Sequence, residues 1–225
     1  MSTDWTDKIV AFDLETTGTD PLTDRIVSAA LVDFDDGERV DAVTWEVDPG
    51  IPIPEQASAV HGVWEADRAG RQAHDTAVLE MVEELWDAWA AGYTVVVFNA
   101  AFDLTMLQAR ARDAGAEFTI GGPVVDPMVA DRYLDKWRKG KRHLEAQCAH
   151  YGVALEDAHN AEADAEAAAR LAIAQAAKWP GEFASEGLME RQERWARENM
   201  DSLRAWMRRQ GRSTADLQEG WPIRA

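Results

Sequence analysis

Two acidic residues, Asp13 and Glu15, interrupt an apolar stretch at residues 9–18. Successive side chains of a β-strand alternate between the two faces of the sheet, so the two carboxylates point the same way. On a buried strand they would repel each other and lose their hydration unless a cation neutralises them. The alternative is a strand end whose acids are solvated. Because the chain later supplies matching polar residues, we favour a metal site.

Three further residues extend this pattern. Asp103 follows an apolar segment at residues 93–98 that is typical of a buried strand, and it lies at the start of a predicted helix. His159 lies five positions before Asp164, so a helix that begins near residue 160 places Asp164 one turn in and leaves His159 on the preceding loop. Four carboxylates and an imidazole could then meet at the carboxyl ends of the strands, where α/β proteins usually keep their sites.

An all-carboxylate ligand set suits a hard divalent cation such as Mg²⁺ or Mn²⁺. Two such ions about 4 Å apart can activate a water molecule, hold the scissile phosphate and stabilise the leaving oxygen. A histidine is suited to take the proton of that water, because imidazole exchanges protons near neutral pH. These residue types and their spacing therefore predict phosphodiester hydrolysis.

The composition limits the classes of protein that fit. The net charge is −18, with −19 in residues 1–177 and +1 in residues 178–225, which argues against general nucleic-acid binding through a broad basic face. Metal ions could still bridge the carboxylates to phosphate. A single cysteine, Cys148, excludes an internal disulfide and a cysteine-only zinc site. With no apolar run of membrane-spanning length and a polar, acidic start to the chain, we expect a cytoplasmic protein without a membrane partner.

The order of predicted elements is that of an α/β fold with a mixed five-stranded sheet flanked by helices. Residues 49–62, rich in proline, are predicted to be a loop. The predicted strands span residues 9–18, 25–34, 40–47, 93–98 and 123–126. The predicted helices span residues 73–91, 102–114, 129–137, 144–151, 161–178 and 188–210.

The chain divides into a domain at residues 8–178 and a helical C-terminal extension at residues 179–225, because Pro180 and Gly181 follow the last helix of the α/β pattern. The extension has apolar residues along one side of its helix, with arginines between them. We expect this helix to pack on the core with its arginines in solvent. The alternative is an arm that binds nucleic acid or a partner protein.

Three segments of the chain resemble the motifs of the DnaQ-like 3′–5′ exonucleases, in their histidine (DEDDh) branch. They are residues 13–18, residues 99–103, and His159 with Asp164. That branch includes the proofreading epsilon subunit of DNA polymerase III, RNase T and oligoribonuclease. The resemblance covers about residues 8–178 and implies an RNase H-like fold, two divalent ions (Mg²⁺ or Mn²⁺) and release of nucleoside 5′-monophosphates from 3′ ends.

By position, the resemblance also implies a role for individual residues. The implied metal ligands are Asp13, Glu15, Asp103 and Asp164, with His159 as the general base. The implied substrate-binding residues are Leu14, Thr16, Thr17, His61, Asn99 and Phe102. The chain departs from the family at two places: Gln56 stands where relatives often carry a glutamate that contacts the 3′-hydroxyl, with Glu55 beside it, and Ala100 stands where they often carry a histidine.

Three functions fit these motifs. We favour an active exonuclease on single-stranded DNA, in proofreading or repair, because every catalytic position is filled. An RNA exonuclease of the RNase T or oligoribonuclease kind shares the motifs, but RNase T-like dimers use a basic patch and no such cluster occurs in residues 1–177, which favours a monomer on DNA. The third is an inactive module that binds DNA ends or a polymerase. A DNA polymerase partner, bound through the extension, also stays open.

Overall fold

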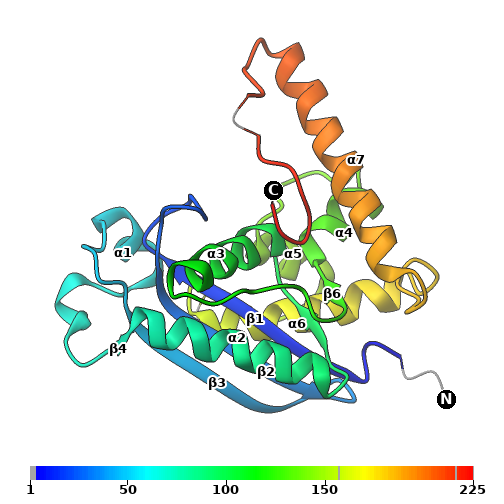
Figure 1. Cartoon of the computed structure of the whole chain (residues 1–225). Helices are drawn as coiled ribbons and strands as arrows, with labels where there is room; N and C mark the ends of the chain where they lie inside the picture. Colours follow the sequence, from blue (N-terminus) through cyan, green and yellow to red (C-terminus); the bar gives the residue numbers. More distant parts are fainter. Residues whose placement is uncertain (1–3, 157, 216, 225) are drawn as a thin grey trace.

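The computed structural model describes residues 4–156, 158–215 and 217–224. Residues 1–3 of the polar N-terminus and residues 216 and 225 of the predicted extension lie outside the described residues. A mixed sheet with strand order β4-β3-β2-β1-β5-β6 lies at the centre, with helices on both faces (Figure 1). The strands are β1 (Lys8–Thr16), β2 (Ile26–Asp35), β3 (Glu38–Asp48), β4 (Gln72–Ala73), β5 (Thr94–Val96) and β6 (Val124–Val125).

The sheet confirms the predicted mixed α/β architecture. Strands β1, β2 and β3 form an antiparallel meander, whereas β5 runs parallel to β1 and β6 parallel to β5. The sheet has one strand more than the five predicted, because β4 pairs with Val47 and Asp48 at the edge of β3. Two residues are too few to show the alternation from which a strand is predicted.

Strand β1 lies at the middle of the sheet because its residues are apolar on both faces. Val10 and Phe12 pack into the cluster formed with helices α2 and α3, whereas Ile9 and Ala11 pack into the cluster formed with α4, α6 and α7. The main helices are α2 (His74–Ala90), α3 (Ala100–Asp113), α4 (Pro127–Leu134), α5 (Leu144–Tyr151), α6 (Ala161–Lys178) and α7 (Leu188–Arg209). No helix in the described part of the chain is both long and apolar enough to span a membrane.

The prediction of a loop across residues 49–62 was wrong, because helix α1 (Glu55–His61) lies within it and the short 3-10 helix η1 (Glu65–Arg68) follows. Pro54 stands at the N-cap of α1, where its missing N–H costs no intrahelical hydrogen bond. Gly62 ends the helix with a left-handed φ of 74°, and its N–H donates to the Ser58 carbonyl. The proline therefore begins a helix here instead of excluding one.

The predicted C-terminal helix packs on the core, as expected from its apolar side. In α7, Trp195 is fully buried and stacks on Tyr133 of α4, with ring centroids 5.6 Å apart. Gln192 completes the edge of the sheet, because its side chain accepts from the Asp126 N–H at 2.8 Å and donates to the Val124 carbonyl at 2.7 Å. Near the other end of the chain, the Trp5 indole donates to the Phe183 carbonyl at 2.8 Å. One hydrophobic cluster thus contains residues from both ends of the chain.

Replacing Trp195 by alanine is expected to destabilise the whole protein by about 3–5 kcal/mol, because the change leaves a large cavity in a shared core. Trp206→Ala is the matched control on the same helix: its side chain is 43% exposed, so we expect a change within about 0.5 kcal/mol. Urea unfolding followed by circular dichroism measures both. A separate early transition in Trp195→Ala, with the remaining unfolding unchanged, would contradict a shared core.

Candidate active site

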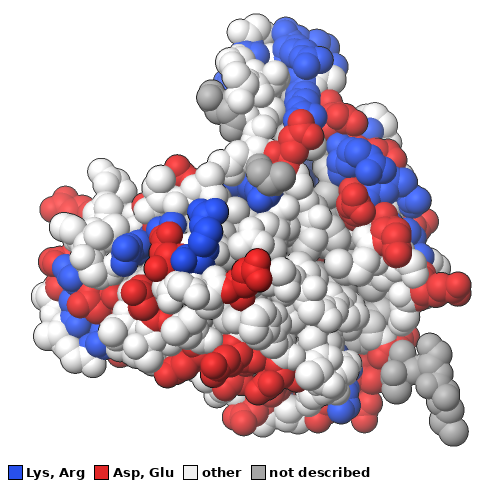
Figure 2. Space-filling view, viewed as in Figure 1, with Lys and Arg blue, Asp and Glu red and all other residues white. Residues whose placement is uncertain are grey.

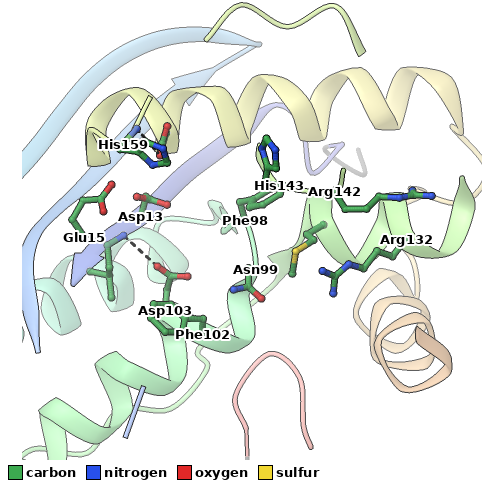
Figure 3. Close-up of a pocket in the computed structure, with 13 residues that line it drawn as sticks. Asp13, Glu15, Phe98, Asn99, Phe102, Asp103, Arg132, Arg142, His143 and His159 are labelled. Carbon is green, nitrogen blue, oxygen red and sulfur yellow. Dashed lines mark hydrogen bonds between the residues drawn. The ribbon is translucent and has the colours of Figure 1, made fainter. Parts of the chain in front are cut away.

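A pocket of about 430 Å³ opens at the carboxyl ends of the parallel strands β1 and β5 (Figure 3). The pocket is lined by β1, the segment between β5 and α3, helices α3, α4 and α6, and the segments that precede α5 and α6. Eight of the residues predicted from the sequence line it: Asp13, Leu14, Glu15, Asn99, Phe102, Asp103, His159 and Asp164. The structure therefore brings together all four predicted carboxylates and the predicted histidine.

Strand β1 directs Asp13 and Glu15 into the pocket from the same face. Alternation places both on the face that packs against α6 through Ile9 and Ala11. The antiparallel pairing with β2 is regular up to Glu15 and shifts register at Thr16, where the strand ends. The acids therefore lie at the last regular positions of the strand, where the sheet opens to solvent.

Helix α3 carries Asp103 in its first turn, and the residue is 4% exposed. One Asp103 oxygen accepts the backbone N–H of Leu14 at 3.2 Å, which ties α3 to β1 between the two strand acids. The helix begins after Asn99, whose backbone is left-handed with φ 66°. Asp126 fixes this start, since its carboxylate accepts the N–H groups of Asn99 at 3.1 Å and Ala100 at 3.0 Å.

The N-terminus of α6 brings in His159 and Asp164. Asn160 caps the helix by accepting the N–H groups of Glu162 and Ala163. His159 stays on the loop, as predicted, with a left-handed φ of 70° and an exposed side chain, and its N–H donates to Asp164 at 3.3 Å. One ligand atom from each of Glu15, His159 and Asp164 lies within 4.8 Å of the others.

Three of the carboxyl groups in the pocket, those of Asp13, Glu15 and Asp103, have raised pKa values. Burial raises the pKa of Asp13 well above its usual range, and the charges of Asp103, Asp164 and Glu15 raise it further. Burial raises the pKa of Glu15 from 4.5 to about 7, with a contribution from Asp164. Burial also raises the pKa of Asp103 well above its usual range, against the hydrogen bond from Leu14. The site is thus short of positive charge, which a hard cation would supply.

Three of the predicted substrate-binding residues, Thr16, Thr17 and His61, do not line this pocket. The Thr17 hydroxyl donates to Asp24 at 3.0 Å and accepts the N–H of Arg25, so it supports the turn that follows β1. The Thr16 hydroxyl donates to the Gly18 carbonyl at 2.7 Å. His61 is partly buried, and burial lowers its pKa, with further lowering from the charge of Arg71.

Five lining residues were not among the predicted site residues: Phe98, Met128, Arg132, Arg142 and His143. His143 caps α5, because its side chain accepts the Ala146 N–H at 3.4 Å. The arginines lie on α4 and on the loop before α5, and their spacing follows no metal or nucleotide motif. The only feature of the sequence that could have pointed to these two arginines is their positive charge in an otherwise acidic domain.

Comparisons with known proteins identify the family to which the chain belongs. The family model RNase T, described as "Exonuclease", matches residues 10–172, which is most of the chain. The chain belongs to this exonuclease family. The resemblance to the DnaQ-like 3′–5′ exonucleases is thereby confirmed. A relative named "DNA polymerase III PolC-type", from Clostridium perfringens, is 32% identical over 166 residues, which are 73% of this chain and 11% of that protein.

Solved structures of exonuclease I share the fold. One superposes with a TM-score of 0.68 at 18% identity, over 79% of this chain and 42% of that chain. The zinc-bound complex of E. coli exonuclease I with single-stranded DNA gives a TM-score of 0.65 at 17% identity, over 77% and 41%. These likenesses confirm the RNase H-like fold. The chain spans about a tenth of the PolC-type relative and less than half of exonuclease I.

Proposed function

We propose that this chain is a divalent-metal-dependent 3′–5′ exonuclease that acts on single-stranded DNA ends and releases nucleoside 5′-monophosphates. The observation that carries the proposal is the convergence of four carboxylates, from three separate segments, on one open pocket with a histidine at its rim. Family membership supports the reaction class. The name of the PolC-type relative, and the DNA bound in the exonuclease I complex, support DNA as the substrate.

The donor set fits divalent ions, because hard oxygen ligands lie close together, and burial and the charges of neighbouring carboxylates raise the pKa values of Asp13 and Glu15. We propose Asp13, Glu15, Asp103 and Asp164 as the ligands of two ions, Mg²⁺ or Mn²⁺. When bound, such ions supply the positive charge that activates the attacking water and stabilises the leaving oxygen.

The chain's own residues would then position the substrate and move one proton. His159 takes the proton of the attacking water as the water adds to phosphorus and the bond from phosphorus to the 3′-oxygen of the penultimate nucleotide breaks. Its hydrogen bond to Asp164 holds the loop beside the carboxylates. Leu14, Asn99 and Phe102 line the pocket where the terminal nucleotide would lie. Thr16, Thr17 and His61 would act from outside the pocket, by holding the loop after β1.

We further propose that residues 8–178 form the catalytic unit and that residues 179–225 support it. The buried hydrogen bonds of Gln192 to the backbone of Val124 and Asp126 are the basis, since Asp126 fixes the start of α3. Association with a DNA polymerase is proposed from the name of the PolC-type relative. Lys and Arg side chains alternate with acidic ones along α7, whereas acidic ones dominate the edge near α2 and β3, so such a partner would meet mixed charge on one side and negative charge on the other (Figure 2).

The direct test uses matched single-stranded DNA and RNA oligonucleotides labelled at the 3′ or the 5′ end, with Mg²⁺, Mn²⁺ or EDTA. We expect mononucleotides to be released from the 3′ end, faster from DNA than from RNA, and EDTA to abolish release. Preferential digestion of RNA would move the assignment to an RNA exonuclease. No cleavage with any ion, together with retained binding of ends, would favour the inactive binding module.

The raised pKa values predict how the metal-free protein responds to pH. Between pH 4.5 and about 7 the folded protein holds the Glu15 proton that the unfolded chain releases, so the free energy of unfolding falls as pH rises through this window, by roughly 3 kcal/mol. Asp13 and Asp103 act in the same direction. Thermal melts in EDTA at pH 5 and pH 8 measure the fall, and Mn²⁺ should reverse it at pH 8.

Glu15→Gln is the matched control for this prediction, because it removes the titrating group and should flatten part of the pH dependence. Asp33, far from the pocket, also has a raised pKa, about 6, so comparison of the variant with the parent isolates the contribution of Glu15. A melting temperature that is the same at both pH values in EDTA would contradict the predicted crowding of the acids.

A further inference from the structure

Arg132 is a positive side chain in the pocket that no step of the proposed reaction uses. It lies on α4 and lines the pocket together with the four carboxylates. Figure 3 shows its guanidinium directed into the pocket on the side of Asn99, away from Asp13, Glu15 and His159. The pocket therefore has an acidic end and a basic end, and a ligand that fills it meets both.

Two carboxylates near Arg132, those of Asp131 and Asp126, are hydrogen-bonded to other residues. Asp131 is fully buried and accepts hydrogen bonds from Arg138, Arg142 and Tyr151, at distances between 2.6 and 3.1 Å. Asp126 is also buried and accepts hydrogen bonds from the backbone N–H groups of Ala100 and Met128 and from the Trp221 indole. Within the described ranges, Arg132 itself makes no hydrogen bond or ion pair. Its guanidinium is therefore available to an anion.

The other basic lining residues are less available. Arg142 holds Asp131 at 2.6 Å and the carbonyls of Asp135 and Arg138 at 2.8 and 2.9 Å, so its role is to fix the loop before α5. His143 caps α5. Arg132 is thus the cation of this pocket whose donors remain unused, as far as the described residues extend. A guanidinium is always charged and its donors match two phosphate oxygens.

We propose that Arg132 binds a phosphate of the single strand on the 5′ side of the scissile bond. This inference rests on the proposed function: the carboxylates mark the position of the reacting phosphate, and Leu14 and Phe102 mark that of the terminal nucleotide. The strand continues from there in the 5′ direction, and the pocket continues past Asn99 to Arg132. Residues 1–177 have a net charge of −19, which disfavours binding of a polyanion. An arginine in the pocket that makes no ion pair with the protein would bind one phosphate and so fix the position of the strand.

The test compares two substrates that differ in the phosphate at issue. An oligodeoxythymidylate has phosphates on the 5′ side of the scissile bond, whereas the p-nitrophenyl ester of thymidine 5′-monophosphate has the reacting phosphate alone. For Arg132→Gln we expect KM for the oligonucleotide to rise about tenfold, with kcat/KM for the ester within about twofold of the parent. Arg132→Lys, which keeps the charge without the planar fork, should restore part of the loss.

Arg197→Gln is the matched control, because Arg197 is an exposed arginine on α7 and its ion pair with Glu193 spans 3.9 Å. It should leave both substrates unchanged. An equal loss on both substrates for Arg132→Gln would make Arg132 a structural residue, and no loss on either would remove it from the substrate path. Either result overturns the proposal.

A binding measurement separates this inference from the proposed function. Fluorescence anisotropy of a labelled oligodeoxythymidylate in EDTA needs no cleavage. We expect Arg132→Gln to bind about tenfold more weakly and to lower the slope of log affinity against log salt by about 0.7. An oligonucleotide with one neutral methylphosphonate in place of the contacted phosphate should bind more weakly to the parent protein, whereas its affinity for Arg132→Gln should be unchanged. If the parent cleaves neither substrate, the proposed function fails; unchanged binding by Arg132→Gln would then overturn this inference as well.

Discussion

Replacing Asp13 by asparagine is expected to lower kcat by about 10⁴-fold and, in the metal-free protein, to raise the melting temperature. Asp13 lies at the centre of the acidic group, and its pKa is raised by burial and by the charges of Asp103, Asp164 and Glu15. At neutral pH the Asp13 carboxyl group therefore lowers the free energy of unfolding when no cation is bound. The amide is of similar shape and uncharged, so it removes repulsion worth about 2 kcal/mol, or roughly 4–8 °C.

Asp33→Asn is the matched control. Asp33 lies on the neighbouring strand β2, and burial and the charge of Asp41 raise its pKa to about 6, but it does not line the pocket. This variant should also stabilise the protein at neutral pH while its exonuclease rate stays within twofold. Steady-state kinetics with Mg²⁺ and melts in EDTA measure both variants. An active Asp13→Asn enzyme would remove Asp13 from the ligand set.

Replacing His159 by glutamine is expected to lower kcat by about 10²–10³-fold and to leave the affinity for Mn²⁺ unchanged. The side chain is exposed at the rim of the pocket, where it can reach an attacking water, and its backbone is held by Asp164. Glutamine is also polar but cannot take up the proton. Single-turnover cleavage gives the rate, and isothermal titration with Mn²⁺ gives the affinity.

The second measurement matters because His159 has an alternative role. Its ring lies within 4.8 Å of ligand atoms of Glu15 and Asp164, a spacing that also permits direct coordination. Loss of a ligand would weaken Mn²⁺ binding by about 10–100-fold, and that result would reassign His159 from base to ligand. His143→Gln is the control, since the other histidine of the pocket caps α5 and should change the rate by less than about threefold.

The parts of the site that could be predicted from the sequence are those that local rules determine. Alternation along a strand is enough to place Asp13 and Glu15 on one face, because the period of a strand is two residues. The cap at Asn160 determines where α6 begins, and hence that His159 stays on a loop and Asp164 enters from the first turn. Helices α5 and α6 begin and end at the predicted residues for the same reason.

The parts that could not be predicted depend on contacts between distant segments. Asp126 accepts hydrogen bonds from the start of α3 and from the Trp221 indole, which join residues up to 95 positions apart. Arg132 lines the pocket because of how α4 packs, which no spacing in the chain records. The hydroxyl of Thr17 is occupied by Asp24 through a turn whose geometry the sequence does not specify.

The contact between Trp5 and Phe183 also bears on how the protein is made. On a ribosome, the β1–β2–β3 meander emerges early, but the face of β1 that carries Ile9 and Ala11 is covered only when α6 and Trp195 have been synthesised. The roughly 150 residues from the end of β3 to Trp195 take about 7–30 s at about 5–20 residues per second. During this time the nascent sheet presents an uncovered apolar face, the kind of surface that chaperones bind. The apolar face of β1 can therefore be fully covered only after residues 183–195 have been synthesised.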